Sequence, residues 1–142
     1  MSITNTASAQ WKGNLKQGKG VVSTNSDALN DVPYDFKQRF EGQAGTNPEE
    51  LIGAAHASCY SMALSMILEG SSLEADSIDT NADVTLEEVD GGFAVTKVHL
   101  TVRASIPGAE ESVFNEAAEK AKAGCPISKL LNAEISLDAK LV

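Results

Sequence analysis

The sequence has 142 residues, of which 20 are acidic and 11 basic, so its formal net charge is −9, and only 5% of its residues are aromatic. A surface of that sign repels phosphate backbones and anionic lipid, and few rings are available to stack on bases, so neither nucleic acid nor membrane is an expected partner. The length fits a single domain, residues 1–142, with one hydrophobic core.

The first third of the chain predicts short strands. Glycine-bounded runs at 9–13, 20–24 and 34–42 are expected to form a small meander. In the third run every second residue faces one way, which places Arg39 on the polar face of a strand. Residues 1–10 are polar, with no basic start and no apolar segment, so we expect no secretory signal and a cytoplasmic protein.

A long helix is predicted over residues 48–69. Asn47 can cap its start, Pro48 suits the first turn, and the two glutamates that follow favour the positive end of the helix dipole. Gly70 is a natural stop. The alanine-rich stretch 51–68 is interrupted by Gly, His, Ser and Cys, which predicts a buried central helix rather than a membrane span.

The second half of the chain predicts a hairpin, two helices and a closing strand. Residues 77–88 and 93–104 alternate as strands around an Asp-Gly turn. A helix with one apolar stripe is predicted over 109–123, a short helix begins at Pro126, and 133–141 alternates as an edge or closing strand. We therefore expect an α+β fold, with antiparallel strands around two central helices.

Two cysteines, Cys59 in the long helix and Cys125 just before Pro126, lie 66 positions apart. That spacing excludes the local C-x-x-C patterns of zinc sites and thioredoxins, and reducing compartments keep ordinary thiols free. The cysteines are either inert core residues or a redox pair, in which an oxidised thiol condenses with the second thiol. Cys59 lies too far along its helix to use the dipole, so electrostatics alone favours Cys125, at a helix start, as the more acidic thiol.

His56 offers two further interpretations. It precedes Cys59 by three residues on one helix face, as a Cys–His nucleophile requires, and such a hydrolase would use His56 as its base. Pooled with His99 and both cysteines it would form a zinc site, but no two of these residues follow structural-zinc spacing, so no metal is expected. A histidine in an alanine-rich helix is more often a hydrogen-bonded core residue.

Four motifs follow one another along nearly the whole chain: Arg39-Phe-Glu-Gly, the run from Thr46-Asn-Pro-Glu-Glu to Cys59-Tyr-Ser-Met-Ala-Leu, the paired segment 79–102, and Lys120-Ala-Lys-Ala-Gly-Cys125-Pro-Ile-Ser. As an ordered set they resemble the OsmC (osmotically inducible protein C) family, sister to the organic hydroperoxide resistance (Ohr) proteins. The resemblance implies a cytoplasmic thiol peroxidase without a cofactor. It further implies an intertwined homodimer with active sites between subunits, which reduces organic hydroperoxides and is itself reduced by an external dithiol, such as a lipoylated protein.

By matching motif position, the resemblance implies that Cys59 is the peroxidatic residue, Cys125 the resolving one, Arg39 the activating arginine and Glu49 the carboxylate that orients it. The family thus favours Cys59 as the attacker, against the electrostatic preference for Cys125. A preference for bulky hydroperoxides would need an apolar pocket. The candidates for it are Phe40, Met62, Met66, Phe114 and Ile127.

The expected helix creates a distance problem for these roles. Ten positions of unbroken helix separate Glu49 from Cys59 by about 15 Å. Either Arg39 reaches Cys59 without Glu49, or the helix breaks near Gly53, or both charged residues come from the partner subunit. We favour the third arrangement, because two antiparallel helices can pack closely through small residues, here Ala54, Ala55, Ala57 and Ser58. A rival from another class is a dimeric, stress-induced binding protein whose buried cysteines are inert.

Overall fold

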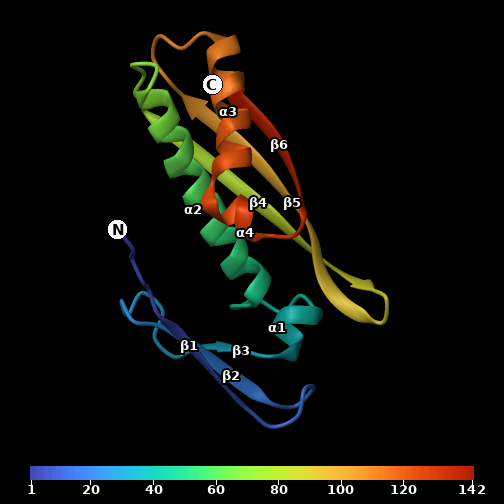
Figure 1. The fold of residues 1–142 in the computed structure, drawn as a ribbon. Coiled ribbons are helices and arrows are strands. Elements are labelled where there is room, and N and C mark those ends of the chain that lie inside the picture. The colour runs from blue at the N-terminus through green and yellow to red at the C-terminus, as the bar shows by residue number, and fades with distance from the viewer. The chain divides into compact units, whose positions relative to one another are not determined.

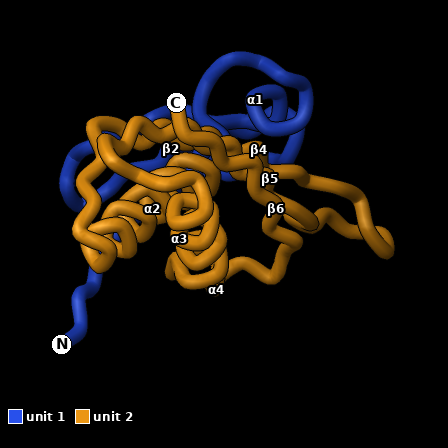
Figure 2. The backbone as a smooth tube through the Cα atoms, turned by 90° about the horizontal axis from the view of Figure 1, so that it is seen from above, with its two compact units in different colours: residues 1–51 blue, residues 52–142 orange.

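The computed structural model describes all 142 residues. Three strands, two helices, two strands, two helices and a last strand follow one another along the chain (Figure 1). They form two compact units, residues 1–51 and residues 52–142, which Figure 2 colours separately. The single domain over residues 1–142 stays a prediction.

The first unit opens with a three-stranded antiparallel sheet in the order β1-β2-β3. Its strands are β1 (Ala7–Lys12), β2 (Lys19–Thr24) and β3 (Val32–Tyr34). The ring centroids of Trp11 and Tyr34 lie 5.5 Å apart, and both residues pair with Gly20 of β2. A Cβ at Gly20 would come within 2.5 Å of the Tyr34 ring and 2.7 Å of the Trp11 ring, so only glycine fits there. The predicted strands over the first two runs are confirmed.

The third run is a helix for most of its length, so the placement of Arg39 on a strand is wrong. Strand β3 ends at Tyr34, and α1 (Phe36–Phe40) follows. Asp35 caps α1, because its Oδ1 accepts the backbone N–H of Gln38 at 3.0 Å. Phe36 and Phe40 fit the alternation of a strand, but residues four apart also lie on one face of a helix. In α1 the centroids of their two rings are 4.9 Å apart.

Helix α2 (Pro48–Glu69) confirms the long helix, and its capping residue is Asn47, whose Oδ1 accepts the backbone N–H of Glu50 at 2.8 Å. By length and composition α2 is the one helix that could cross a membrane, a test that core helices also pass. One of its faces lies in the core of the second unit, where its side chains are at most 1% exposed. The residues are His56, Tyr60, Leu64 and Leu68.

The second unit is built on the sheet β4-β5-β6. The predicted hairpin is confirmed: β4 (Ser77–Val89) and β5 (Gly92–Ser105) are antiparallel, and Asp90 and Gly91 between them have φ of 51° and 79°, as a type I′ turn requires. The last strand, β6 (Glu134–Leu141), pairs with β5 in parallel. This exception to antiparallel pairing arises because two helices, α3 (Glu111–Gly124) and α4 (Pro126–Leu130), carry the chain back from β5 to β6.

Helices α2 and α3 cover one face of this sheet (Figure 1). Alternate residues of β5, from Val98 to Ala104, are fully buried against them. Phe114 is the largest buried side chain that α3 contributes. The α+β class is confirmed, and the packing of α3 brings Cys125, which follows it directly, into the core.

Candidate active site

The two cysteines meet in the second unit. Both are free thiols; Cys59 on α2 is half-buried and Cys125, the N-cap residue of α4, is fully buried. Their side chains share a hydrogen bond, and the backbone N–H of Ile127 in α4 also donates to the Cys59 sulfur. Two thiols 66 positions apart in the sequence are therefore close enough to interact.

The surroundings of Cys59 hold its thiol in the protonated form. Burial raises the pKa of Cys59 above its ordinary value, and the hydrogen bond with Cys125 raises this pKa further. Only the Ile127 amide acts to lower the pKa, and no cationic side chain contributes. Because thiolate is the reactive form of cysteine, a nucleophilic role for Cys59 would require a positive charge from elsewhere.

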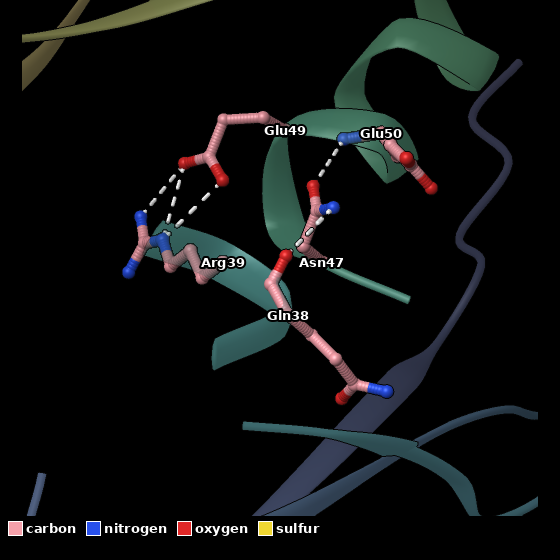
Figure 3. Close-up of polar contacts among 5 residues, drawn as sticks. All are labelled: Gln38, Arg39, Asn47, Glu49 and Glu50. Carbon is pink, nitrogen blue, oxygen red and sulfur yellow. Dashed lines mark hydrogen bonds and ion pairs between the residues drawn. The ribbon is translucent and has the colours of Figure 1, made fainter. Parts of the chain in front are cut away.

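The candidate source of that charge, Arg39, lies in the first unit and is paired with Glu49. The Arg39 Nη2 lies 2.8 Å from Oε1 of Glu49, and its Nε lies 3.3 Å from both carboxylate oxygens (Figure 3). The Glu49 side chain is 12% exposed and the Arg39 side chain 37%. This fork-like contact fixes the plane of the guanidinium group as well as its position.

Local hydrogen bonds hold the two helices that carry the ion pair (Figure 3). The side-chain amide of Asn47 donates to the carbonyl oxygen of Gln38 in α1 at 3.4 Å. Its oxygen accepts the N–H of Glu50 in α2 at 2.8 Å. Asn47 thus caps α2 and links it to α1, which sets Arg39 opposite Glu49. We call residues 35–50 the arginine corner.

The unbroken course of α2 bears on the three arrangements left open by the sequence. No break occurs near Gly53; a Cβ at this glycine would lie 3.3 Å from the carbonyl oxygen of Ala82 in β4, so Gly53 allows close packing instead. The broken-helix arrangement is therefore wrong. Arg39 is bound to Glu49 within the first unit.

His56 is fully buried, and its Nε2 lies 2.7 Å from Oγ of Ser128 in α4. Burial lowers the pKa of His56, so the ring is neutral near pH 7. The hydrogen-bond partner of Nε2 is Ser128 and not Cys59, which disfavours a Cys–His nucleophile. His99 lies on β5, where its Nδ1 is 2.6 Å from Oγ of Ser136 in β6. The structure brings no three His, Cys, Asp or Glu side chains together as a metal site.

The five candidate pocket residues have different surroundings. Phe114 is fully buried in the core and Ile127 packs against that core. Met62 and Met66 are exposed on α2, at 76% and 68%. Phe40 borders a cavity of about 260 Å³ in the first unit, together with Trp11, Leu15, Tyr34, Asp35, Phe36 and Arg39.

Two contacts at this site were not predicted from the sequence: the Ile127 amide on Cys59, and Ser128 on His56. A sequence signal was available for the first of these contacts only. Pro126 starts a helix, so the N–H of the next residue is free to donate outside that helix.

The comparisons with known proteins identify the family and the fold of this chain. The family model described as OsmC-like protein matches residues 40–140. The chain is 55% identical over 141 residues to the peroxiredoxin OsmC of Escherichia coli strain K12, covering 99% of each chain. It is 33% identical over 103 residues to the organic hydroperoxide resistance protein OhrB of Bacillus subtilis, covering 70% of this chain and 74% of that one.

The fold agrees as well. The crystal structure of the same OhrB matches this structure with a TM-score of 0.75 at 28% identity, covering 95% of this chain and 98% of that one. The family model spans more than half of the chain. Its range begins at Phe40, directly after Arg39, and includes Glu49 and both cysteines. The chain therefore belongs to the OsmC family.

Proposed function

We propose that the protein reduces organic hydroperoxides to alcohols with Cys59 as the attacking thiol and Cys125 as the resolving thiol. The observation that carries this proposal is the contact between the two free thiols in the second unit. The enzyme class is that of the relatives: the protein is a cysteine-based, peroxiredoxin-like enzyme.

The proposed reaction has three steps. The Cys59 thiolate attacks one oxygen of ROOH, the O–O bond breaks, and ROH leaves after the alkoxide takes up a proton, with Cys59 oxidised to a sulfenic acid. The Cys125 sulfur then bonds to the Cys59 sulfur and water leaves. An external dithiol finally reduces this disulfide by thiol–disulfide exchange and is oxidised to its own disulfide.

The activating charge in this proposal comes from the partner subunit of a homodimer. Two observations support it: no cation is among the causes that act on the raised pKa of Cys59, and Arg39 is already paired with Glu49 in the first unit. The face of α2 near its start also offers small, exposed residues at Ala54, Ala55 and Ser58. Two such helices packed antiparallel about a two-fold axis would bring the start of one near the middle of the other.

The apolar part of the substrate is proposed to lie in the cavity beside Arg39. Its lining is largely aromatic, with Trp11, Tyr34 and Phe40 around one cation, and its volume of about 260 Å³ suits a small organic group. The Arg39 guanidinium carbon lies 5.3 Å from the centroid of the Phe40 ring, so the charge and the apolar wall are adjacent. We place the enzyme in the cytoplasm, where a dithiol such as a lipoylated protein is the proposed reductant.

The direct test is mass spectrometry of the protein after one equivalent of cumene hydroperoxide. We expect the loss of two hydrogens and, after digestion, a linked peptide containing Cys59 and Cys125. Unchanged thiols in the native protein would support the inert-cysteine alternative. Turnover of esters without any reductant would instead support the Cys–His hydrolase.

A Cys125→Ser variant separates the two thiol roles. It should still consume about one equivalent of peroxide, because the first attack needs only Cys59, and then stop with Cys59 as a sulfenic acid. A variant unable to react even once would mean that the two roles are reversed.

A further inference from the structure

Two contacts connect α2 with the segment 125–128, and they have matching spacing. His56 and Cys59 are three residues apart on α2, and Cys125 and Ser128 are three residues apart around the start of α4. His56 contacts Ser128, and Cys59 contacts Cys125. The earlier residue of α2 thus meets the later residue of the segment 125–128, so the two segments pair in an antiparallel sense. The first contact therefore fixes the same relative position of α2 and α4 that the thiol contact needs.

Helix α4 depends on such a contact. It has only five residues, Pro126–Leu130, and none of them is fully buried. Ile127 is the one residue of α4 that packs against the core, so packing gives this short helix few contacts, and Cys125 is the residue that begins it. By contrast, His56 is fully buried, and its Nε2 lies only 2.7 Å from the Ser128 hydroxyl.

The hydrogen bond is also costly to break. The Nδ1 atom of His56 is buried without a partner, so Ser128 provides the only hydrogen bond of that ring. If the Ser128 hydroxyl moved away, both ring nitrogens would be left buried and unpaired. The hydrogen bond between His56 and Ser128 therefore favours the position of α4 in which it stays bound to α2.

We propose that the hydrogen bond between His56 and Ser128 positions Cys125 for disulfide formation, which makes both of them positioning residues for the resolving step. This inference rests on the proposed function. In the step concerned, the S–O bond of the Cys59 sulfenic acid breaks as the bond to the Cys125 sulfur forms, and the hydroxyl leaves as water with the thiol proton. The organic hydroperoxide, consumed in the previous step, is the oxidant.

The hydrogen bond between His56 and Ser128 should affect disulfide formation more than the first oxidation of Cys59. Attack on the hydroperoxide needs only Cys59 and the substrate. Disulfide formation needs two protein sulfurs within bonding distance, and a displacement of about 1 Å can slow such an aligned reaction about 100-fold.

The test compares the two steps in Ser128→Ala by stopped flow with cumene hydroperoxide. We expect the first oxidation of Cys59 to stay within about twofold of wild type and disulfide formation to slow by about 10- to 100-fold. The sulfenic acid should then accumulate, be trapped by dimedone, and over-oxidise at lower peroxide concentrations than in wild type. Ser128→Thr, which keeps the hydroxyl, should restore the fast step.

The chain offers a matched control. Ser136→Ala removes the other serine hydroxyl that contacts a histidine, His99 at 2.6 Å, between β5 and β6. Both steps should be unchanged in this variant. If Ser128→Ala does not fold, the isosteric variants Ser128→Thr and Ser128→Val make the same comparison, and only Ser128→Val should be slow.

Disulfide formation at the wild-type rate without the hydroxyl, in Ser128→Ala or Ser128→Val, would overturn the inference while leaving the proposed function intact. Equal slowing in Ser128→Thr would also overturn it, because the hydroxyl would then not matter. A wild-type protein that forms no Cys59–Cys125 disulfide would instead contradict the proposed function itself.

Discussion

The arginine corner and the thiol pair are held in place by different forces. In the arginine corner, helix-capping side chains and an ion pair position the Arg39 side chain, which remains 37% exposed. In the thiol pair, Cys125 is fully buried, and the Ile127 backbone amide is the one group that lowers the pKa of Cys59. The first region contains the proposed activating charge, and the second contains the proposed nucleophile.

This difference matters because each region lacks what the other offers. Burial and Cys125 raise the pKa of Cys59, which disfavours the reactive thiolate. A cation brought to a water-poor site interacts more strongly than one at the surface. The proposed chemistry therefore depends on joining the two regions, and the following predictions test that dependence.

The largest effect is expected from removing the nucleophile. Cys59→Ser should lower peroxidase turnover by at least about 1,000-fold, because a serine hydroxyl is neither ionised at neutral pH nor as nucleophilic as a thiolate. Steady-state assays with cumene hydroperoxide and a dithiol measure this. Appreciable activity in the folded variant would contradict the assignment of Cys59.

Removing the charge should have the next largest effect. Arg39→Ala should lower activity at pH 7 by roughly 10- to 1,000-fold, since a neighbouring opposite charge shifts a pKa by about 1–3 units. Without the cation the pKa of Cys59 stays raised, so its thiolate forms only at higher pH, and the activity of the variant should recover as the pH rises.

The pH profile of the second-order rate with peroxide measures this shift, and Arg39→Lys is the matched control. Arg39→Lys keeps the charge but loses the two-point contact with Glu49. Its pH profile should therefore lie between those of wild type and Arg39→Ala. An Arg39→Ala profile parallel to that of wild type would show that Arg39 does not act on Cys59.

A partial recovery is expected when two inactive variants are mixed. If Arg39 serves the Cys59 of the other chain, a mixed dimer of Cys59→Ser and Arg39→Ala contains one intact site. Random re-pairing of equal amounts makes half of the dimers mixed, so activity should approach about one-quarter of wild type per site. A mixture that stays inactive after verified subunit exchange would show that Arg39 acts within its own chain.

The smallest effect is expected at the edge of the arginine corner. The hydrogen bond from Lys19 and then that from the Gln38 N–H hold the pKa of Asp35 below its ordinary value. Such a group stabilises the folded state fully above its unfolded pKa, and this contribution is lost as the pH falls through the lowered folded pKa.

Asp35→Asn keeps the helix cap but removes the charge, so it should lower the urea midpoint slightly at pH 7, with the difference disappearing in strong acid. Glu88→Gln, at an exposed position of the hairpin, is a control for the loss of one negative charge. An equal decrease at both pH values in Asp35→Asn would contradict the role assigned to the charge.

Local signals in the sequence predicted most of the fold. Asn47 and Pro48 marked the start of α2, and the Asp-Gly turn marked the hairpin, because capping and turn geometry depend on few neighbouring residues. The α1 segment was misassigned since apolar residues at 36 and 40 fit both a strand and a helix, and the Asp35 cap decides between them. The parallel pairing of β6 depends on the path of α3, which local patterns do not encode.

The candidate site was predictable only in part. The resemblance to a family named the two cysteines, Arg39 and Glu49, whose ion pair the structure contains. The contact of Ser128 with His56 joins residues 72 positions apart. It depends on how α4 packs, so no local sequence pattern predicts it.

Trp11 gives the arginine corner an optical signal of its own. It is the single tryptophan of the chain, it borders the cavity beside Arg39, and its indole N–H donates to the carbonyl oxygen of Gly13 at 3.0 Å. All intrinsic tryptophan fluorescence therefore comes from the first unit, and none comes from the unit with the cysteines. A change of emission on oxidation of Cys59 would report, without any label, that the two regions communicate during turnover.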